Sequence, residues 1–165
     1  MSPFRNMVTF VVMRFAAIAI LCLLAACSEP PKPAAEAPRP PRPMDEARRF
    51  PMMNRVSADV VETPIMGKAF LPAGNVAKYK DNKSEWELFV YKAASEGEAG
   101  TKLLDYKNSL AEPKFVAHFG GYFGLDAGKP VFLFSKGKYV AGVVGLPLDR
   151  ADALARDFAA RIPPS

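Results

Sequence analysis

The feature that most constrains the fold is a pair of short apolar segments, residues 131–135 and 138–144, separated by Lys136-Gly137. Both segments are rich in β-branched and aromatic residues, and a two-residue connection containing glycine is typical of a β-hairpin. Side chains alternate between the two faces of a strand. The hairpin therefore predicts two apolar faces, both of which need to be covered.

The expected register places Phe134 opposite Tyr139 and Leu133 opposite Val140. One face then holds the aliphatic residues Val131, Leu133, Val140 and Val144, and the other holds Phe132, Phe134, Tyr139, Ala141 and Val143. We expect two helices to cover one face and residues 50–80 to cover the other. The alternatives for covering that second face are a second copy of the chain, a protein partner or an apolar ligand.

Two helices are predicted. Ser95-Glu96-Gly97-Glu98 has the pattern of a capping box, and apolar residues follow it at helical spacing, which predicts a helix over about 96–111. Asp149, with Asp152 three residues later, is the expected N-cap of a second helix over about 150–161, closed by Pro163-Pro164. The inner face of this second helix is expected to contain Ala151, Leu154, Ala155, Phe158 and Ile162.

The remaining periodic segments read as strands. They are residues 56–62, 76–80 and 86–93, and a glycine-bent region over 114–129 that makes one or two strands. Strands, helix, strands and helix in this order predict an α+β domain with a mainly antiparallel sheet over residues 50–165. The layout from Trp86 onward resembles that of an uncharacterised family of secreted bacterial domains, and this resemblance implies no activity.

The N-terminal segment has the pattern of a secretory signal. Arg14 is followed by an apolar run from Phe15 to Ala26, which at about a dozen residues is shorter than the roughly 20 that a membrane-spanning helix needs. Leu24-Ala25-Ala26-Cys27 closes the run and resembles the lipobox of bacterial lipoproteins. A start at Met1, Met7 or Met13 is compatible with this pattern.

The lipobox resemblance implies that residues 1–26 are a signal peptide and that Cys27 receives acyl chains such as palmitate. Several acyl chains on one residue give stable membrane anchoring, whereas one chain is marginal. Ser28 in place of an aspartate implies sorting to the periplasmic face of the outer membrane rather than retention in the inner membrane. An uncleaved signal anchor and a plain cleaved signal are the alternatives.

Residues 27–49 are expected to form the lipidated cysteine and a linker. Proline dominates residues 30–43, and too few apolar residues are present to offset the entropy of folding. We therefore expect a disordered, extended tether between the membrane and the domain. Its arginines either contact anionic lipid or cell-wall polymer or keep the spacer soluble, and the interleaved acidic residues favour the spacer.

Charge and cysteine content exclude several classes of function. Removal of residues 1–26 lowers the formal net charge from +5 to +3, and no basic stripe with interleaved aromatics indicates nucleic-acid binding. Cys22 and Cys27 are the only cysteines, so residues 50–165 cannot contain a disulfide, a thiolate nucleophile or a cysteine metal site. No cofactor or metal motif is present, and the oligomeric state stays open.

The candidate functional residues are few. His118 is the only histidine, and we expect it to be a structural residue in a strand. The alternative is a role as a catalytic base. Glu87, near Glu85, is the other candidate base. A glycine-containing aromatic segment and the hairpin offer candidate contacts for a ligand or partner, namely Tyr122, Phe123, Phe132, Phe134 and Tyr139.

Because no nucleophile motif accompanies these residues, the sequence favours a non-enzymatic binding or structural accessory domain on a membrane-anchored lipoprotein. Its partners are expected to be the membrane, through Cys27, and an envelope protein or cell-wall component. The alternatives are a small periplasmic hydrolase that uses His118 or Glu87, and a binder of apolar ligands or lipids.

Overall fold

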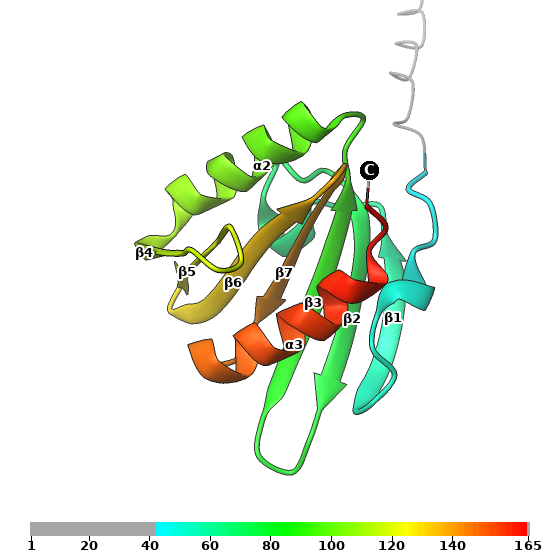
Figure 1. The fold of residues 1–165 in the computed structure, drawn as a ribbon. Helices are drawn as coiled ribbons and strands as arrows, with labels where there is room; N and C mark the ends of the chain where they lie inside the picture. Colours follow the sequence, from blue (N-terminus) through cyan, green and yellow to red (C-terminus); the bar gives the residue numbers. More distant parts are fainter. Residues whose placement is uncertain (1–41, 165) are drawn as a thin grey trace, which may run out of the picture. The chain divides into compact units, whose positions relative to one another are not determined.

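The computed structural model describes residues 42–164, which form one seven-stranded antiparallel sheet with two α-helices (Figure 1). This confirms the expected α+β class with a mainly antiparallel sheet. The expected signal peptide, the acylation site at Cys27 and the tether as far as Pro41 lie outside the described residues.

The sheet has the strand order β1-β2-β3-β7-β6-β5-β4, so β3 and β7 meet at its centre although they are far apart in the sequence. Every neighbouring pair is antiparallel. The strands are β1 (Arg55–Val61), β2 (Gly74–Lys80), β3 (Glu85–Lys92), β4 (Ala111–Val116), β5 (Gly121–Asp126), β6 (Lys129–Lys136) and β7 (Tyr139–Val144).

Helix α2 (Glu96–Ser109) begins as the sequence predicts. The Ser95 hydroxyl accepts a hydrogen bond from the Glu98 amide at 3.1 Å, which satisfies one of the free donors of the first turn. The Glu98 carboxylate accepts from the amide of Ala94 at 2.9 Å instead of from that of Ser95, and also from the Tyr91 hydroxyl at 3.1 Å. These bonds attach the start of α2 to the end of β3.

Helix α3 (Leu148–Arg161) starts earlier than predicted, and the expected N-cap at Asp149 is wrong. Pro147 occupies the N-cap position in an extended conformation, and Asp149 lies inside the first turn. A carboxylate in the first turn interacts favourably with the helix dipole without having to cap an amide. Two short 3₁₀ turns, η2 (Ala47–Arg49) and η3 (Ile65–Gly67), complete the secondary structure.

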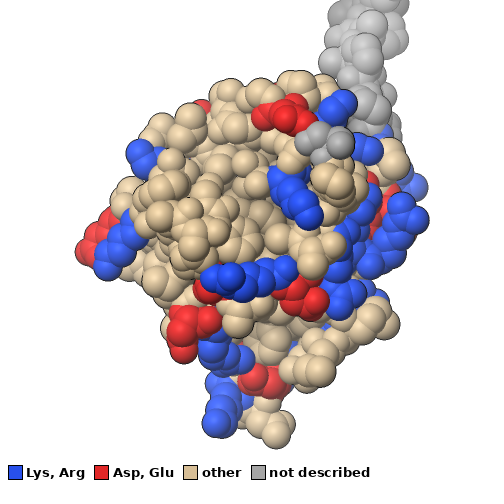
Figure 2. Space-filling view, viewed as in Figure 1, with Lys and Arg blue, Asp and Glu red and all other residues tan. Residues whose placement is uncertain are grey.

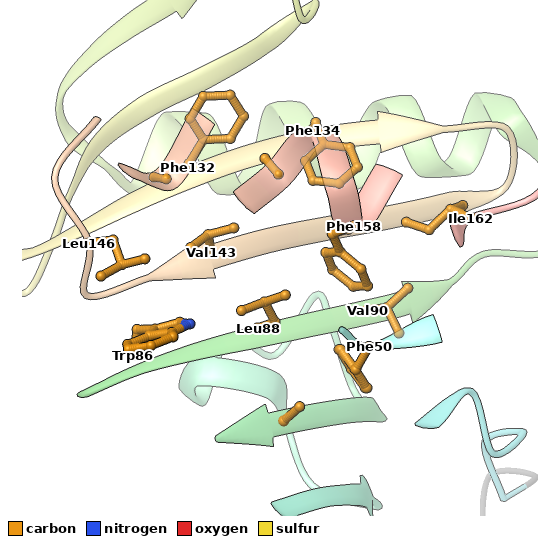
Figure 3. Close-up of a cluster of buried hydrophobic side chains, with 14 of the residues drawn as sticks. Phe50, Trp86, Leu88, Val90, Phe132, Phe134, Val143, Leu146, Phe158 and Ile162 are labelled. Carbon is orange, nitrogen blue, oxygen red and sulfur yellow. The ribbon is translucent and has the colours of Figure 1, made fainter. Parts of the chain in front are cut away.

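The two helices cover opposite faces of the sheet, so the expectation that both lie on one face is wrong. We name the faces after the helix that covers each. On the α3 face, the helix residues Ala151, Ala155 and Phe158 pack on the second apolar set of the hairpin, and Phe158 lies between Phe134 and Phe50 (Figure 3). The buried strand residues of the α3 face include Trp86, Leu88, Val90, Phe132, Phe134, Tyr139, Ala141 and Val143.

The α2 face is covered by α2 together with residues 65–71. Helix residues Leu103 and Tyr106 pack with Ile65 and Leu71 over the first apolar set of the hairpin. Residues 50–80 therefore contribute to covering both faces, with Ile65 and Leu71 on one and Phe50 on the other. The two apolar faces predicted for the hairpin are thus both buried within this chain.

The register of the β6–β7 hairpin differs from the expected one. Phe134 pairs with Ala141, and Lys136 pairs with Tyr139, so the two-residue turn is Gly137-Lys138. Gly137 has a φ of 55°, a left-handed conformation that favours glycine at the first turn position. Because the shift spans two residues, every side chain keeps its expected face although its cross-strand partner changes.

The centre of the sheet depends on a close approach between Gly142 in β7 and Phe89 in β3, which are directly paired. A Cβ atom on Gly142 would lie 2.6 Å from Cζ of Phe89 and 3.0 Å from the carbonyl oxygen of Phe132. The Phe89 ring therefore occupies the space that any other residue would need at position 142.

The fold begins before Phe50, earlier than the expected end of the linker. Residues 44–50, which we call the N-terminal strap, are fixed by hydrogen bonds to the sheet. The backbone amide of Glu46 donates to Oδ1 of Asn75 at 2.9 Å, and the Tyr139 hydroxyl donates to Glu46 Oε1 at 3.2 Å. Arg49 pairs with the Glu46 carboxylate at 2.5 Å, so the buried charge of Glu46 is compensated.

Candidate functional site

A shallow depression of about 380 Å³ lies along one side of α3. We call it the α3 groove. It is lined by residues from the turn after β4, the end of β6 and the second half of α3, namely His118, Phe119, Phe134, Ser135, Lys136, Arg156, Ala159 and Ala160. Figure 2 shows this side of the molecule, where an area without charged side chains lies beside α3 and is bordered by basic ones.

His118 follows β4 in a tight turn, so its expected position within a strand is wrong. The next residue, Phe119, fixes this turn because its ring packs edge-on against Phe132 and Phe134, with ring centroids 5.1 and 4.9 Å apart. Gly120 closes the turn with a φ of 68°, and its backbone amide donates a hydrogen bond to the carbonyl oxygen of Val116. Because the Phe119 ring is anchored in the core, the neighbouring His118 is exposed on the protein surface beside α3.

His118 lies against α3 through Asp152. Its Nε2 atom is 2.7 Å from Asp152 Oδ1, and the second carboxylate oxygen of Asp152 accepts from Nε of Arg156 at 3.0 Å. Burial raises the pKa of Asp152, but the hydrogen bonds from His118 and Arg156 outweigh it and lower this pKa below its ordinary value. Asp152 therefore remains a carboxylate at neutral pH and orients both basic side chains.

The basic groups of the groove are spread along the helix. Asp152, Arg156 and Ala160 are separated by four residues each and so share one side of α3. At the far end, Nζ of Lys136 donates to the carbonyl oxygen of Ala159 at 2.8 Å. Three basic side chains, those of His118, Arg156 and Lys136, thus line a groove whose floor is aromatic and aliphatic.

The structure overturns part of the expected aromatic contact site. Phe132, Phe134 and Tyr139 are at most 6% exposed, because α3 and Phe50 cover this face of the hairpin. They are core residues, and an apolar partner for that face is not required. Phe134 alone also contributes to a surface feature, since it forms part of the floor of the α3 groove.

Tyr122 and Phe123 are both half-buried and lie on opposite faces of β5, because they are successive residues of one strand. Phe123 packs against the core of the α3 face, and Tyr122 packs against that of the α2 face. The ring of Tyr122 lies 5.5 Å from that of Phe115, which is 62% exposed. The structure therefore does not unite the five expected aromatic residues in one site.

Glu87 lines a separate cavity of about 350 Å³ at the other end of the central strands. It lies directly across from Lys78 in β2, and Glu85 and Lys129 also line the cavity. Glu85 is paired with Lys80 at 2.6 Å on the exposed surface. The structure therefore places Glu87 in a pocket of mixed charge. This pocket shares no lining residue with the groove that contains His118.

Asp126 has a structural role on the α2 face. It accepts from Nζ of Lys68 at 2.8 Å and from the Tyr106 hydroxyl at 3.0 Å. Burial, followed by the charge of Asp126, raises the pKa of Tyr106. These part-buried bonds connect the residue that follows η3 with α2 and β5.

Within residues 42–164, no three or more His, Cys, Asp or Glu side chains are grouped so that they could hold a metal ion. None of the helices in this same part of the chain is both long and apolar enough to cross a membrane. Comparisons of the chain with protein-family models, with curated proteins and with solved structures found no match.

Of the residues that line the groove, the sequence singled out His118 and Phe134 but not the others. Asp152 is 34 positions away from His118, so only the fold brings the two side chains together. The spacing of Asp152 and Arg156 was the one local signal, since an acidic residue four positions before a basic one forms a pair on a helix. Lys136 had no sequence signal beyond its place beside the hairpin turn.

Proposed function

We propose that this protein is a membrane-anchored lipoprotein of the bacterial envelope whose folded domain is a binding or structural accessory. The observation that supports the proposal is the segment Leu24-Ala25-Ala26-Cys27, which follows a short apolar run and resembles a lipobox. Acylated Cys27 would attach the chain to the membrane, and Ser28 favours the periplasmic face of the outer membrane. The partner of the domain would be an envelope protein or a cell-wall component.

The start of the fold is consistent with such a role. Eighteen residues separate Cys27 from Glu46, the first residue whose backbone amide is bonded to the sheet. At no more than about 3.5 Å per residue, they could hold the domain up to about 60 Å from the membrane. The domain could therefore reach partners in the envelope without contacting the lipid itself.

Metabolic labelling with radioactive palmitate tests the anchor. Cys27→Ser should abolish labelling. Cys22→Ser is the matched control, because Cys22 lies within the proposed signal peptide, and it should leave labelling intact. Labelling that persists in Cys27→Ser, or that is lost equally in Cys22→Ser, would contradict acylation at Cys27.

A second candidate function is a small hydrolase with His118 as the general base. The 2.7 Å contact with Asp152 favours it, because a carboxylate that fixes one ring nitrogen leaves the other free to accept a proton from water. If Nε2–H donates to Asp152, Nδ1 is the free acceptor. Glu87 is the alternative base, in its separate cavity.

The hydrolase can be tested with nitrophenyl acetate and nitrophenyl phosphate. His118→Gln keeps a hydrogen-bonding side chain but removes the base, and it should lower any hydrolysis rate by about a hundredfold or more. Glu87→Gln is the parallel variant for the second cavity. A rate unaffected by either substitution would leave the accessory function as the better account.

A further inference from the structure

We propose that the α3 groove binds a small amphiphile, meaning one carboxylate or phosphate group attached to an apolar body. This inference names a ligand class for the accessory domain and so rests on the proposed binding function. It is drawn from three observations at the groove: its basic side chains, its apolar floor and its size.

Arg156 and Lys136 have N–H donors that make no hydrogen bond within residues 42–164. Arg156 uses Nε for Asp152, and neither of its Nη atoms bonds to a residue within 42–164. Lys136 uses one of its three N–H donors for the carbonyl of Ala159. The guanidinium group of Arg156 and the ammonium group of Lys136 are therefore held in place by hydrogen bonds within the protein. Their remaining donors face solvent beside the groove.

The single acidic side chain beside this site offsets only part of the positive charge, because its ion pair is with Arg156 and not with Lys136. Asp152 is already bonded to His118 through one oxygen and to Arg156 through the other. It lines the neighbouring depression, with Val116, Leu148 and Asp149, but not the groove itself. An anionic group in the groove thus meets Arg156 and Lys136 without an intervening carboxylate.

The floor of the groove calls for an apolar body on the ligand. Phe119 and Phe134 lie beneath it, and Ala159 and Ala160 form its wall on α3, with Ala160 exposed. These small side chains leave the half-buried ring of Phe119 accessible to a ligand, whereas Phe134 is 1% exposed. Apolar contacts with a few convergent polar groups are typical of small-molecule sites.

The size of the groove favours a small molecule over a membrane surface. Its volume of about 380 Å³ lies at the lower end of ligand pockets, which span roughly 300–1,000 Å³. The helical segment from Asp152 to Ala159 that flanks it is about 10 Å long. An anionic bilayer instead requires several basic residues on one accessible surface, whereas two of the three basic side chains here, those of Arg156 and Lys136, are held at the edges of a depression.

The test is titration of the full chain carrying Cys27→Ser, monitored by amide NMR signals, with decanoate as the probe. Decanoate should shift the signals of residues 118–120, 135–136 and 156–160. Decan-1-ol, which lacks the charge, should bind at least about tenfold more weakly, the loss expected when charge-assisted hydrogen bonds are absent. Equal affinity for decan-1-ol, or shifts confined to other residues, would overturn the proposal.

Variants on α3 make the test specific. Arg156→Gln and Lys136→Gln should each weaken decanoate binding about tenfold, and Ala160→Trp should block it by filling the groove at an exposed position. Arg161→Gln is the matched control, because Arg161 also pairs with an aspartate four residues earlier but does not line the groove. An equal loss in Arg161→Gln would overturn the proposal, since it would indicate attraction by net charge alone.

The anionic group could belong to a free small molecule or to the head group of a membrane lipid. Flotation of the same chain with phosphatidylglycerol vesicles distinguishes these two sources. The proposal expects no flotation above that with phosphatidylcholine vesicles. Flotation that depends on Arg156 and Lys136 would overturn the small-molecule site in favour of a membrane-binding surface. Neither result depends on acylation, so failure of this inference is distinguishable from failure of the Cys27 labelling test.

Discussion

Phe50 stacks on Phe158, with ring centroids 5.2 Å apart and ring planes 24° from parallel. The contact joins the N-terminal strap to the last turn but one of α3, and both rings are almost completely buried. Phe50 thus closes the edge of the core on the α3 face, at a point 108 residues away along the chain.

Phe50→Ala should lower the free energy of unfolding by about 3–5 kcal/mol, because it removes a buried ring and leaves a cavity. Urea denaturation followed by tryptophan fluorescence measures this, since Trp86 lies in the same core. Met53→Ala is the control, as Met53 is 80% exposed, and it should change stability by less than about 0.5 kcal/mol. A loss for Phe50→Ala as small as that for Met53→Ala would mean that the strap is not part of the folded unit.

Gly142→Ala should destabilise the fold by about 1–3 kcal/mol, because the added methyl group overlaps the Phe89 ring at the centre of the sheet. Combining it with Phe89→Leu should recover part of the loss, which thermal unfolding of both variants would measure. Gly100→Ala in α2 is the matched control. Nothing lies within 4 Å of its Cβ position, so the better helix former should stabilise the chain by up to about 1 kcal/mol.

Burial raises the pKa of the Tyr79 hydroxyl to about 12, against an ordinary value of 10.0. This hydroxyl donates to the carbonyl of Pro51 at 2.8 Å. Because the folded-state pKa is the higher one, its stabilising contribution is complete below pH 10 and is lost as the pH rises through 12. Urea denaturation between pH 9 and 12 should show this decline, and Tyr79→Phe should make it shallower while costing about 1 kcal/mol at neutral pH. An unchanged decline in Tyr79→Phe would assign the effect to other groups.

Asp81 closes the β2–β3 turn, where its Oδ1 accepts from the backbone amides of Lys83 and Ser84. These bonds, chiefly that from Lys83, lower its pKa to about 2, with a further contribution from Arg150. Its stabilising effect is therefore present above pH 3.8 and lost as the pH falls through 2. Carboxyl ¹³C NMR titration should give a midpoint near 2, and Arg150→Gln should raise it only in part. A return to the ordinary value in that variant would contradict the role of the backbone amides.

The sequence predicted the composition of each face better than the pairing between strands. Alternation placed Phe132 and Phe134 on one face and Val131 and Leu133 on the other, as observed, because the period of a strand is two. The register was wrong because it depends on which residue of the turn adopts a positive φ, and Gly137 takes the first position. Similarly, local periodicity identified both helices but held no information about which face each would cover.

The strap and the candidate site were the parts that local patterns could not predict. Glu46 and Arg49 read as charged linker residues, yet their charges pair with each other and with Tyr139 from β7. His118 was identifiable by residue type alone, but Asp152 and Lys136 come from other elements and meet it only through the fold. Contacts between distant segments are set by packing, which a single sequence does not display.

The position of the strap has a mechanical consequence. A pull on the chain from the side of residue 42 would load, after the exposed ion pair of Arg42 with Glu62, the bonds of Met44 and Glu46 to Asn75 in β2. Glu46 is also hydrogen-bonded to Tyr139 in β7. Arg49 extends these links to the carbonyl of Arg161 at the end of α3. The force would therefore enter the sheet through interior strands and a helix end, and β1 would be shielded from being peeled off the edge of the sheet.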